Sequence, residues 1–374
     1  MACQSEERDV TNPFQALFQP AAFGPLTLRN RLVMAPMTRE FSPNGVPGVD
    51  VAQYYRRRAE GGVGLIVTEG TLIDHPAANA YSDRVPRFHG DDALNGWKGV
   101  VDAVHAVGGH IIPQIWHTGA VREPGASGSE LPGYGPMELR AEDGTLRCQA
   151  MSPADIEAVV NAYGTAAAQA ERLGFDGVEI HGAHGYLVDQ FMRESSNARA
   201  DAYGRSLDRR LRFALHAVAA VRANVRPEFP VVFRFSQWKS GDYAARIAND
   251  PGHLARLLEP LSAAGVDVFH ASTRRFWEPA FEGSGRTLAA WTRHITGKPV
   301  IAVGGLGLDD KPGPGLPADA PSLRHLEEGF ARGDFDFIAA GRALLADAGW
   351  GNKLADGRLG EIIRFDPSQL ETLD

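Results

Sequence analysis

The feature that most constrains the fold is an alternation of short apolar runs with amphipathic segments over the whole chain. The runs are mostly continuous rather than alternating in polarity, which is typical of strands buried on both faces of a parallel sheet. They span 30–36, 63–70, 110–117, 177–181, 230–236, 266–272, 299–305 and 335–341. Segments with helical spacing lie between them, at 91–108, 153–173, 207–225, 251–264 and 321–332.

The segment 153–173 gives the clearest helical signal. Its apolar residues recur at the spacing of one helix face. Ser152 is placed to cap the first turn, Pro153 occupies that turn, and Gly174 follows the last one. We therefore predict a helix with both ends at these residues.

Eight strands separated by helices predict a (β/α)8 TIM barrel, built as a single domain over 21–362. An open doubly wound sheet is the alternative, but no G-x-G-x-x-G follows the first strand. Because about 250 residues suffice for a bare barrel, this chain of 374 residues must carry long loops. We place them at 118–151, 237–250, 273–286 and 306–320. Residues 1–20 are expected to be a loose extension, and 363–374 a C-terminal tail.

Charge and composition exclude several classes of function. A net charge of −8 argues against a nucleic-acid partner. No segment has the roughly 20 apolar residues that a membrane span needs, and the N-terminus carries early acids rather than a signal peptide. Two cysteines far apart, Cys3 and Cys148, fit a reducing compartment, so we expect a cytoplasmic protein.

Polar residues gather where the predicted strands end. In a (β/α)8 barrel these ends meet at one face, where the site lies. Burial of so many polar groups costs free energy unless partners satisfy them, so they predict a polar ligand of some size. The residues are Thr38, Arg39, Glu69, Gly70, Gln114, Trp116, His117, His181, Arg234, Ser236, His270, Ser272, Gly304, Gly305, Gly341 and Arg342.

The last two strand ends carry a pattern that favours phosphate. Glycine allows backbone N–H groups to approach an anion closely, and an arginine can grip it with two nitrogens. Gly304 and Gly305 follow the seventh strand, and Gly341 and Arg342 follow the eighth. The alternative is that these glycines only form turns.

Six motifs together resemble the Old Yellow Enzyme family of flavin-dependent ene-reductases. They are "APMTR" (35–39), "QIWHTG" (114–119), "GFDGVEIHGAHGYLVDQF" (174–191), "DAYGRSLDRRLRF" (201–213), "FRFS" (233–236) and "AAGRALLAD" (339–347). The resemblance implies FMN bound at the barrel mouth and reduced by NADH or NADPH. A hydride would then pass from flavin N5 to an activated alkene, such as an enone, enal, nitroalkene or maleimide, in a ping-pong reaction.

The resemblance also implies which residues hold the flavin. The ring would contact the loop after the first strand and three further strand ends, and the phosphate would lie at the glycine-rich ends. These positions are Pro36, Met37, Thr38, Gly70, Gln114, Arg234, Gly304, Gly305, Gly341 and Arg342. The chemistry agrees, since the Arg234 cation would stabilise negative charge on a reduced flavin, and the Gln114 amide offers a donor and an acceptor. The alternative for Arg234 is an ion pair inside the barrel.

The "HGAHGY" block would then carry the reaction. His181 and His184 are predicted to donate hydrogen bonds to the substrate oxygen on which charge develops. Tyr186, protonated at neutral pH, is predicted to give a proton to the alkene. Gly182 and Gly185 would let the chain turn. Trp116 is expected to wall the substrate pocket, and Trp277 to overhang it.

Other interpretations of the histidines remain. One is a strand-end histidine with a structural role, and another is a metal-dependent barrel hydrolase or lyase in which His117 joins His181 and His184. We favour no metal, because no carboxylate is well placed beside them. A flavin carrier without turnover is a third possibility. The partners expected are the alkene and the nicotinamide cofactor, in a monomer or a homodimer.

Three positions depart from the family pattern. Ala120 stands where an arginine is usual after "WHxG", and Arg205 replaces the second glycine of "DxYGGS". The loop after the first strand has Met37 and Thr38 without the cysteine that tunes the flavin in some relatives.

Overall fold

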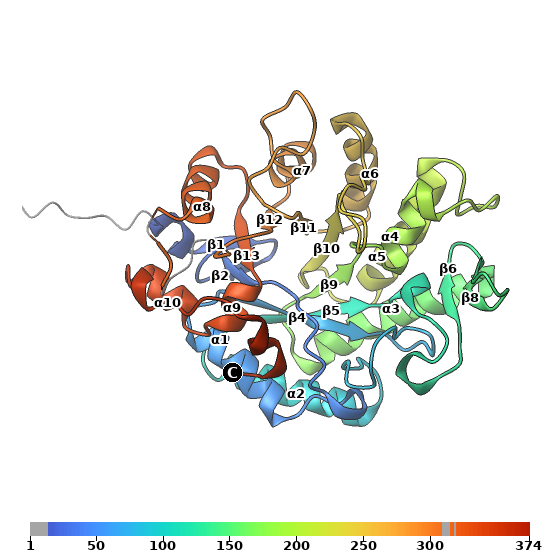
Figure 1. Ribbon diagram of the computed structural model, residues 1–374, viewed down its shortest axis with the longest axis horizontal. Coiled ribbons are helices and arrows are strands. Elements are labelled where there is room, and N and C mark those ends of the chain that lie inside the picture. Colours follow the sequence, from blue (N-terminus) through green and yellow to red (C-terminus); the bar gives the residue numbers. More distant parts are fainter. Residues whose placement is uncertain (1–13, 309–314, 318) are drawn as a thin grey trace, which may run out of the picture.

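Eight parallel strands close into a barrel in the computed structural model, which describes residues 14–308, 315–317 and 319–374 (Figure 1). Each strand pairs with the next along the chain, and the last pairs with the first. The strands are β3 (Leu32–Met34), β4 (Leu65–Leu72), β5 (Ile111–Trp116), β9 (Val178–His181), β10 (Val231–Ser236), β11 (Val268–Ser272), β12 (Val300–Val303) and β13 (Phe337–Ala340). The predicted (β/α)8 barrel is confirmed, and the open sheet is excluded.

Helices surround the barrel (Figure 1). They are α1 (Val49–Glu60), α2 (Asp91–His105), α3 (Pro153–Leu173), α4 (Leu187–Met192), α5 (Leu207–Ala223), α6 (Pro251–Ala263), α7 (Leu288–Thr296), α8 (Pro321–Arg332), α9 (Arg342–Ala346) and α10 (Trp350–Ala355). The sequence analysis gave no range for α1, α4, α7, α9 or α10. Tyr54, Tyr55 and Arg58 of α1 are buried, although each side chain carries a polar group, a hydroxyl in the tyrosines and a guanidinium in the arginine.

The ends of α3 are those that the sequence predicts. The Ser152 hydroxyl accepts a hydrogen bond from the Asp155 amide, and the Asp155 carboxylate accepts one from the Ser152 amide. This reciprocal capping satisfies two amides that have no partner within the helix. Gly174 ends the helix in the left-handed conformation, with φ of 88°.

A hairpin of β1 (Ala21–Phe23) and β2 (Leu26–Leu28) closes the N-terminal end of the barrel. Phe23 and Leu28 belong to the apolar cluster of the barrel interior, and Phe23 meets Phe337 edge to face at 5.3 Å. Within the predicted extension 1–20, the described residues begin at Phe14; Leu17 is fully buried, and its carbonyl accepts a hydrogen bond from the Arg31 amide. Residues 1–13 lie outside the described part of the chain.

The predicted loop 118–151 contains a small sheet of its own. Its strands are β6 (Gly133–Gly135), β7 (Leu139–Arg140) and β8 (Leu146–Ala150). Short 3-10 turns occur at Gln15–Phe18, Pro43–Gly45, Gly119–Val121, Ala126–Gly128, Glu194–Ser196, Leu359–Glu361 and Pro367–Glu371. No helix among the described residues has the length and apolar character needed to cross a membrane.

The tail 363–374 folds back onto the barrel beside the loop after β3. The buried guanidinium of Arg39 donates to the carbonyls of Gln369, Leu370 and Thr372 at 3.3, 3.0 and 2.6 Å. Arg57 donates to the carbonyl of Leu373. The final turn of the described chain is therefore fastened to the loop that enters the predicted site.

Candidate functional site

A cavity of about 330 Å³ lies at the C-terminal ends of the barrel strands. This is the face at which (β/α)8 barrels build their sites. The predicted site residues that line it are Pro36, Met37, Thr38, Gly70, Gln114, Trp116, His181, His184, Tyr186, Arg234, Gly304, Gly305, Gly341 and Arg342. Ser272 and Thr273, at the end of β11, line it as well, so residues from all eight strand ends converge on one space.

Trp277, which is expected to overhang the site, is not among the residues that line this cavity, but a Cβ on Gly305 would lie 3.3 Å from its ring. Its ring stacks on His325 at 5.0 Å between centroids. Besides Trp116, the tryptophan that lines the cavity is Trp238, in the loop after β10, which stacks on His184 at 4.4 Å. The loops after β10 and β11 each carry a tryptophan, and only the packing of the loops shows that Trp238 is the one that lines the cavity.

The turn after β9 places two of the predicted residues at the cavity. His184 has a φ of 64°, a left-handed conformation that histidine tolerates better than most residues other than glycine. Gly185 follows with φ of 86°. The His184 amide donates to the Ser236 hydroxyl at 2.9 Å. Gly182 instead supplies space, because a Cβ there would lie 2.5 Å from the Phe233 ring.

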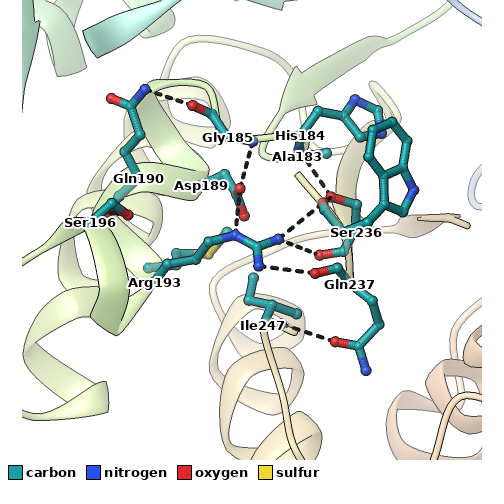
Figure 2. A network of polar contacts seen from close by, with 12 residues as sticks. Ala183, His184, Gly185, Asp189, Gln190, Arg193, Ser196, Ser236, Gln237 and Ile247 are labelled. Carbon is teal, nitrogen blue, oxygen red and sulfur yellow. Dashed lines mark hydrogen bonds and ion pairs between the residues drawn. The ribbon is translucent and has the colours of Figure 1, made fainter. Parts of the chain in front are cut away.

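A buried ion pair holds this turn from beneath, as Figure 2 shows. The Arg193 Nε lies 2.7 Å from Asp189 Oδ2, and both side chains are almost fully buried. The same carboxylate oxygen accepts from the Gly185 amide at 2.7 Å. The remaining Arg193 nitrogens donate to the carbonyls of Ser236 and Gln237, each at 2.9 Å. The pair therefore joins the turn to the end of β10; the sequence analysis had missed both residues.

Trp116 forms one wall of the cavity. Its ring stacks on His181 at 5.8 Å with planes 18° apart, and meets Tyr186 edge to face at 4.8 Å. A Cβ at position 70 would lie 2.5 Å from the Trp116 ring, so the glycine at Gly70 is needed for this placement.

The two histidines are neutral near pH 7. Burial, followed by the charge of Arg234, lowers the pKa of both His181 and His184 well below the usual range. His181 Nδ1 accepts a hydrogen bond from the Ala183 amide at 3.3 Å, which places the ring proton on Nε2. His184 Nε2 lies 2.8 Å from the Ser272 hydroxyl. Two neutral imidazoles with N–H groups thus border the cavity.

Tyr186 is a protonated phenol in this setting. Its side chain is 9% exposed, and burial raises its pKa above the ordinary value, as does the neighbouring Tyr81. The Tyr186 and Tyr81 hydroxyls lie 2.7 Å apart. The His181 and Tyr186 rings are 5.0 Å apart, so a hydrogen-bond donor and an acid face the same small volume.

Arg234 lies fully within the barrel mouth, and its Nε has no hydrogen-bond partner among the described residues. The nearby Glu179 carboxylate is bonded elsewhere, to Gln114 Nε2 at 2.7 Å and His270 Nδ1 at 2.6 Å. Burial would raise the Glu179 pKa, but His270 and Arg234 outweigh it and lower that pKa. The acid therefore supports Gln114 and His270 by direct contact and Arg234 through its charge.

The glycines after β12 lie against the preceding loop with no room for a side chain. Gly304 has a φ of 144°, and a Cβ there would lie 2.3 Å from the Thr273 carbonyl oxygen. Gly305 has a φ of 80°. Both conformations favour glycine and leave bare backbone at the cavity wall.

His117 does not join the other two histidines. Its Nε2 lies 2.9 Å from His75 Nδ1, and it does not line the cavity. Within the described ranges, no group of three His, Cys, Asp or Glu side chains could hold a metal ion. The geometry therefore gives no support to the hydrolase or lyase alternative.

Glu69 lies beneath the loop that carries Thr38. Its side chain is 2% exposed, and Oε2 accepts from the Arg39 and Glu40 amides at 2.8 and 3.3 Å. Burial raises its pKa from 4.5 to about 7, although these amides oppose the shift.

We expect the Glu69 carboxyl to make stability depend on pH. A raised pKa gives stabilisation that is complete below pH 4.5 and is lost as pH rises through about 7. A shift of this size corresponds to about 3 kcal/mol. The difference in melting temperature between Glu69→Gln and the wild type should therefore grow in favour of the variant as the pH rises from 5 to 8. A difference between the two proteins that is constant over this range would contradict the assignment.

Comparisons with known proteins agree with this architecture. Residues 16–361 match the family described as NADH:flavin oxidoreductase / NADH oxidase. The chain is 33% identical over 358 residues to an NADH oxidase of Thermoanaerobacter brockii, covering 93% of this chain and 52% of that protein. It is 33% identical over 343 residues to 12-oxophytodienoate reductase 2 of Arabidopsis thaliana, covering 88% of this chain and 86% of that one.

A solved structure, morphinone reductase in complex with tetrahydroNAD, shares the fold. The TM-score is 0.78 at 29% sequence identity, and the match covers 95% of this chain and 94% of that one. This chain spans about half the length of the Thermoanaerobacter protein and of 12-oxophytodienoate reductase 7 of Oryza sativa, 52% and 54%. It spans nearly the whole of the structural neighbour.

Proposed function

The chain belongs to the NADH:flavin oxidoreductase / NADH oxidase family, that of Old Yellow Enzyme, and from this we propose that it reduces activated C=C bonds with NADH or NADPH. The substrate class comprises enones, enals, nitroalkenes and maleimides. One observation carries the proposal: His181, His184 and Tyr186 face a single cavity, and the His181 ring centroid lies 5.3 Å from that of His184 and 5.0 Å from that of Tyr186. Two donors beside one acid suit an alkene conjugated to an oxygen-bearing group.

The residues present fit FMN, the cofactor of the family. The Arg234 Nε is buried without a hydrogen-bond partner in the described part of the chain, as expected of a cation whose ligand binds in the cavity. Gln114 is held in place by Glu179 and would meet the edge of the ring system. Gly304, Gly305, Gly341 and Arg342 would hold the phosphate, since bare backbone and a guanidinium suit an anion. Pro36, Met37, Thr38 and Gly70 would contact the ring.

When bound, FMN supplies the two electrons that the alkene accepts, after taking them from the nicotinamide cofactor. The chain contributes binding, orientation and a proton. His181 Nε2 donates a hydrogen bond to the substrate oxygen, and His184 joins it by releasing Ser272. Both are neutral, so they stabilise the developing anion without a formal ion pair. The Tyr186 Oη gives its proton to the alkene carbon next to the carbonyl or nitro group.

Trp116 restricts the space over His181 and Tyr186 and excludes water from the donors. We propose that reductant and alkene occupy this part of the cavity in turn, which is a ping-pong order. Both ligands would need the same wall and the same pair of histidines.

The experiment that tests the function begins with colour. Purified protein should be yellow and release FMN on denaturation. Anaerobic reduction by NADH or NADPH should bleach it, and 2-cyclohexenone or N-ethylmaleimide should restore the colour in stopped flow. Failure of every activated alkene to reoxidise the reduced protein would contradict ene-reduction and favour a flavin carrier. Colourless protein with stoichiometric zinc would favour the metal-dependent alternative.

A further inference from the structure

Tyr186 must regain a proton after each turnover, and none of the site residues named so far provides one. Its hydroxyl is buried, and each turnover would remove its proton. A replacement must arrive from solvent while ligand fills the cavity in front of it. The groups around the ring are Trp116, His181 and Tyr81. Trp116 is a donor that cannot be protonated further, and His181 faces the substrate.

Tyr81 lies on the other side of Tyr186. Its hydroxyl is 2.7 Å from the Tyr186 hydroxyl, and its ring packs on Trp116 at 5.6 Å. Tyr81 does not line the main cavity, and its side chain is half-buried rather than enclosed. It therefore contacts the acid from behind, where a bound alkene would not reach it.

The loop that carries Tyr81 is built to hold it there. Asn79 Oδ1 accepts from the Tyr81 amide at 2.9 Å, and Asn79 Nδ2 donates to the Ser82 carbonyl at 2.8 Å. The Ala78 carbonyl accepts from both the amide and the hydroxyl of Thr118, at 2.9 and 2.8 Å. The backbone of this loop is thus held before, at and after Tyr81.

We propose that Tyr81 is a positioning residue for the acid, which orients the Tyr186 hydroxyl and returns a solvent proton to it. This inference rests on the proposed ene-reduction. In this relay, Tyr81 takes a proton from water and passes it to Tyr186, which passes its own proton to the substrate carbon.

The alkene receives a hydride at one carbon, with the electrons that the family's nicotinamide reductant provides. The Tyr186 O–H bond breaks as a C–H bond forms at the other carbon. The Tyr81 proton moves to the Tyr186 oxygen, and a proton from hydronium or buffer moves to Tyr81. Both phenols end in their starting state, and the net reduction consumes one hydride and one solvent proton.

Tyr81→Phe tests this, because it removes the hydroxyl and keeps the ring on Trp116. We expect reoxidation of the reduced enzyme by 2-cyclohexenone to slow about tenfold, which is less than the 10²–10⁴-fold contributed by a general acid itself, because the acid remains in place. Reoxidation by p-benzoquinone, which takes its protons on oxygen, should be unchanged. Rates in mixtures of H₂O and D₂O should depend on deuterium content with curvature in the wild type and linearly in Tyr81→Phe.

Tyr134→Phe is the matched control, since Tyr134 is also half-buried, contacts His75 at 5.2 Å and has no described contact with Tyr186. It should behave as the wild type. In a Tyr186→Phe background, Tyr81→Phe should have no further effect, because a relay without its inner member cannot be weakened again. Additive losses, or equal losses with enone and quinone, would overturn the relay.

The outcomes separate the two proposals. If Tyr186→Phe slows the enone reaction while Tyr81→Phe matches the wild type, the relay is wrong and ene-reduction stands. If the wild type reduces no activated alkene, the proposed function fails and the relay fails with it.

Discussion

Tyr186→Phe is expected to slow reoxidation of the reduced enzyme by an enone about 10²–10⁴-fold, the usual contribution of a positioned general acid. The variant keeps the ring that meets Trp116 and His181 and loses only the hydroxyl, which burial keeps protonated in the wild type. Reduction by NADH or NADPH needs no such proton and should stay within a few-fold of the wild type. Stopped-flow measurement of the two half-reactions separates these effects.

The pH profile adds a second test of the same residue. Because burial raises the Tyr186 pKa above its ordinary value, the enone reaction should show no loss from phenol ionisation up to at least pH 9. A variant slowed equally in both half-reactions would show that Tyr186 supports the flavin site rather than the proton transfer.

His181→Ala combined with His184→Ala is expected to give the second large loss. One donor to a developing oxyanion is worth about 10²–10³ in rate, and this variant removes both imidazoles from the cavity. Affinity of the oxidised enzyme for a phenol should fall as well, since the oxygen of such a ligand uses the same donors. Spectral titration with p-hydroxybenzaldehyde measures this without turnover.

His325→Ala serves as the control for the histidine pair, because His325 stacks on Trp277 outside the cavity. His184→Asn keeps a donor at a position whose φ of 64° asparagine also accepts. It should retain much of the phenol affinity that the double variant loses. Unchanged phenol binding in the double variant would contradict the assignment of the donors.

The barrel could be predicted from the sequence because its strands are buried on both faces. Continuous apolar runs such as 230–236 correspond to strands directly, as β10 (Val231–Ser236) shows. Residues at strand ends, such as Gln114 and Arg234, could be placed at the cavity by topology alone. Arg205, which departs from the family pattern, has a φ of 68°, a conformation that a glycine occupies without strain.

Two of the residues that the sequence analysis missed, Tyr81 and Trp238, lie in loops. The paths of these loops depend on packing against other segments, and neither residue lies on a strand that would fix the direction of its side chain. The ion pair of Asp189 and Arg193 was visible only as opposite charges four residues apart, which is usually a surface feature. The structural role of this pair depends on its burial. Whether a short helix such as α4 is buried depends on tertiary packing, which the sequence does not show.

The contacts of Arg39 bear on how the protein is made in the cell. Its guanidinium is satisfied by carbonyls that follow it by 330 to 333 residues. During synthesis, the Arg39 guanidinium therefore lacks these hydrogen bonds until Gln369, Leu370 and Thr372 have left the ribosome. The loop that carries Thr38 can therefore reach its final state only after a segment more than 300 residues downstream has been synthesised.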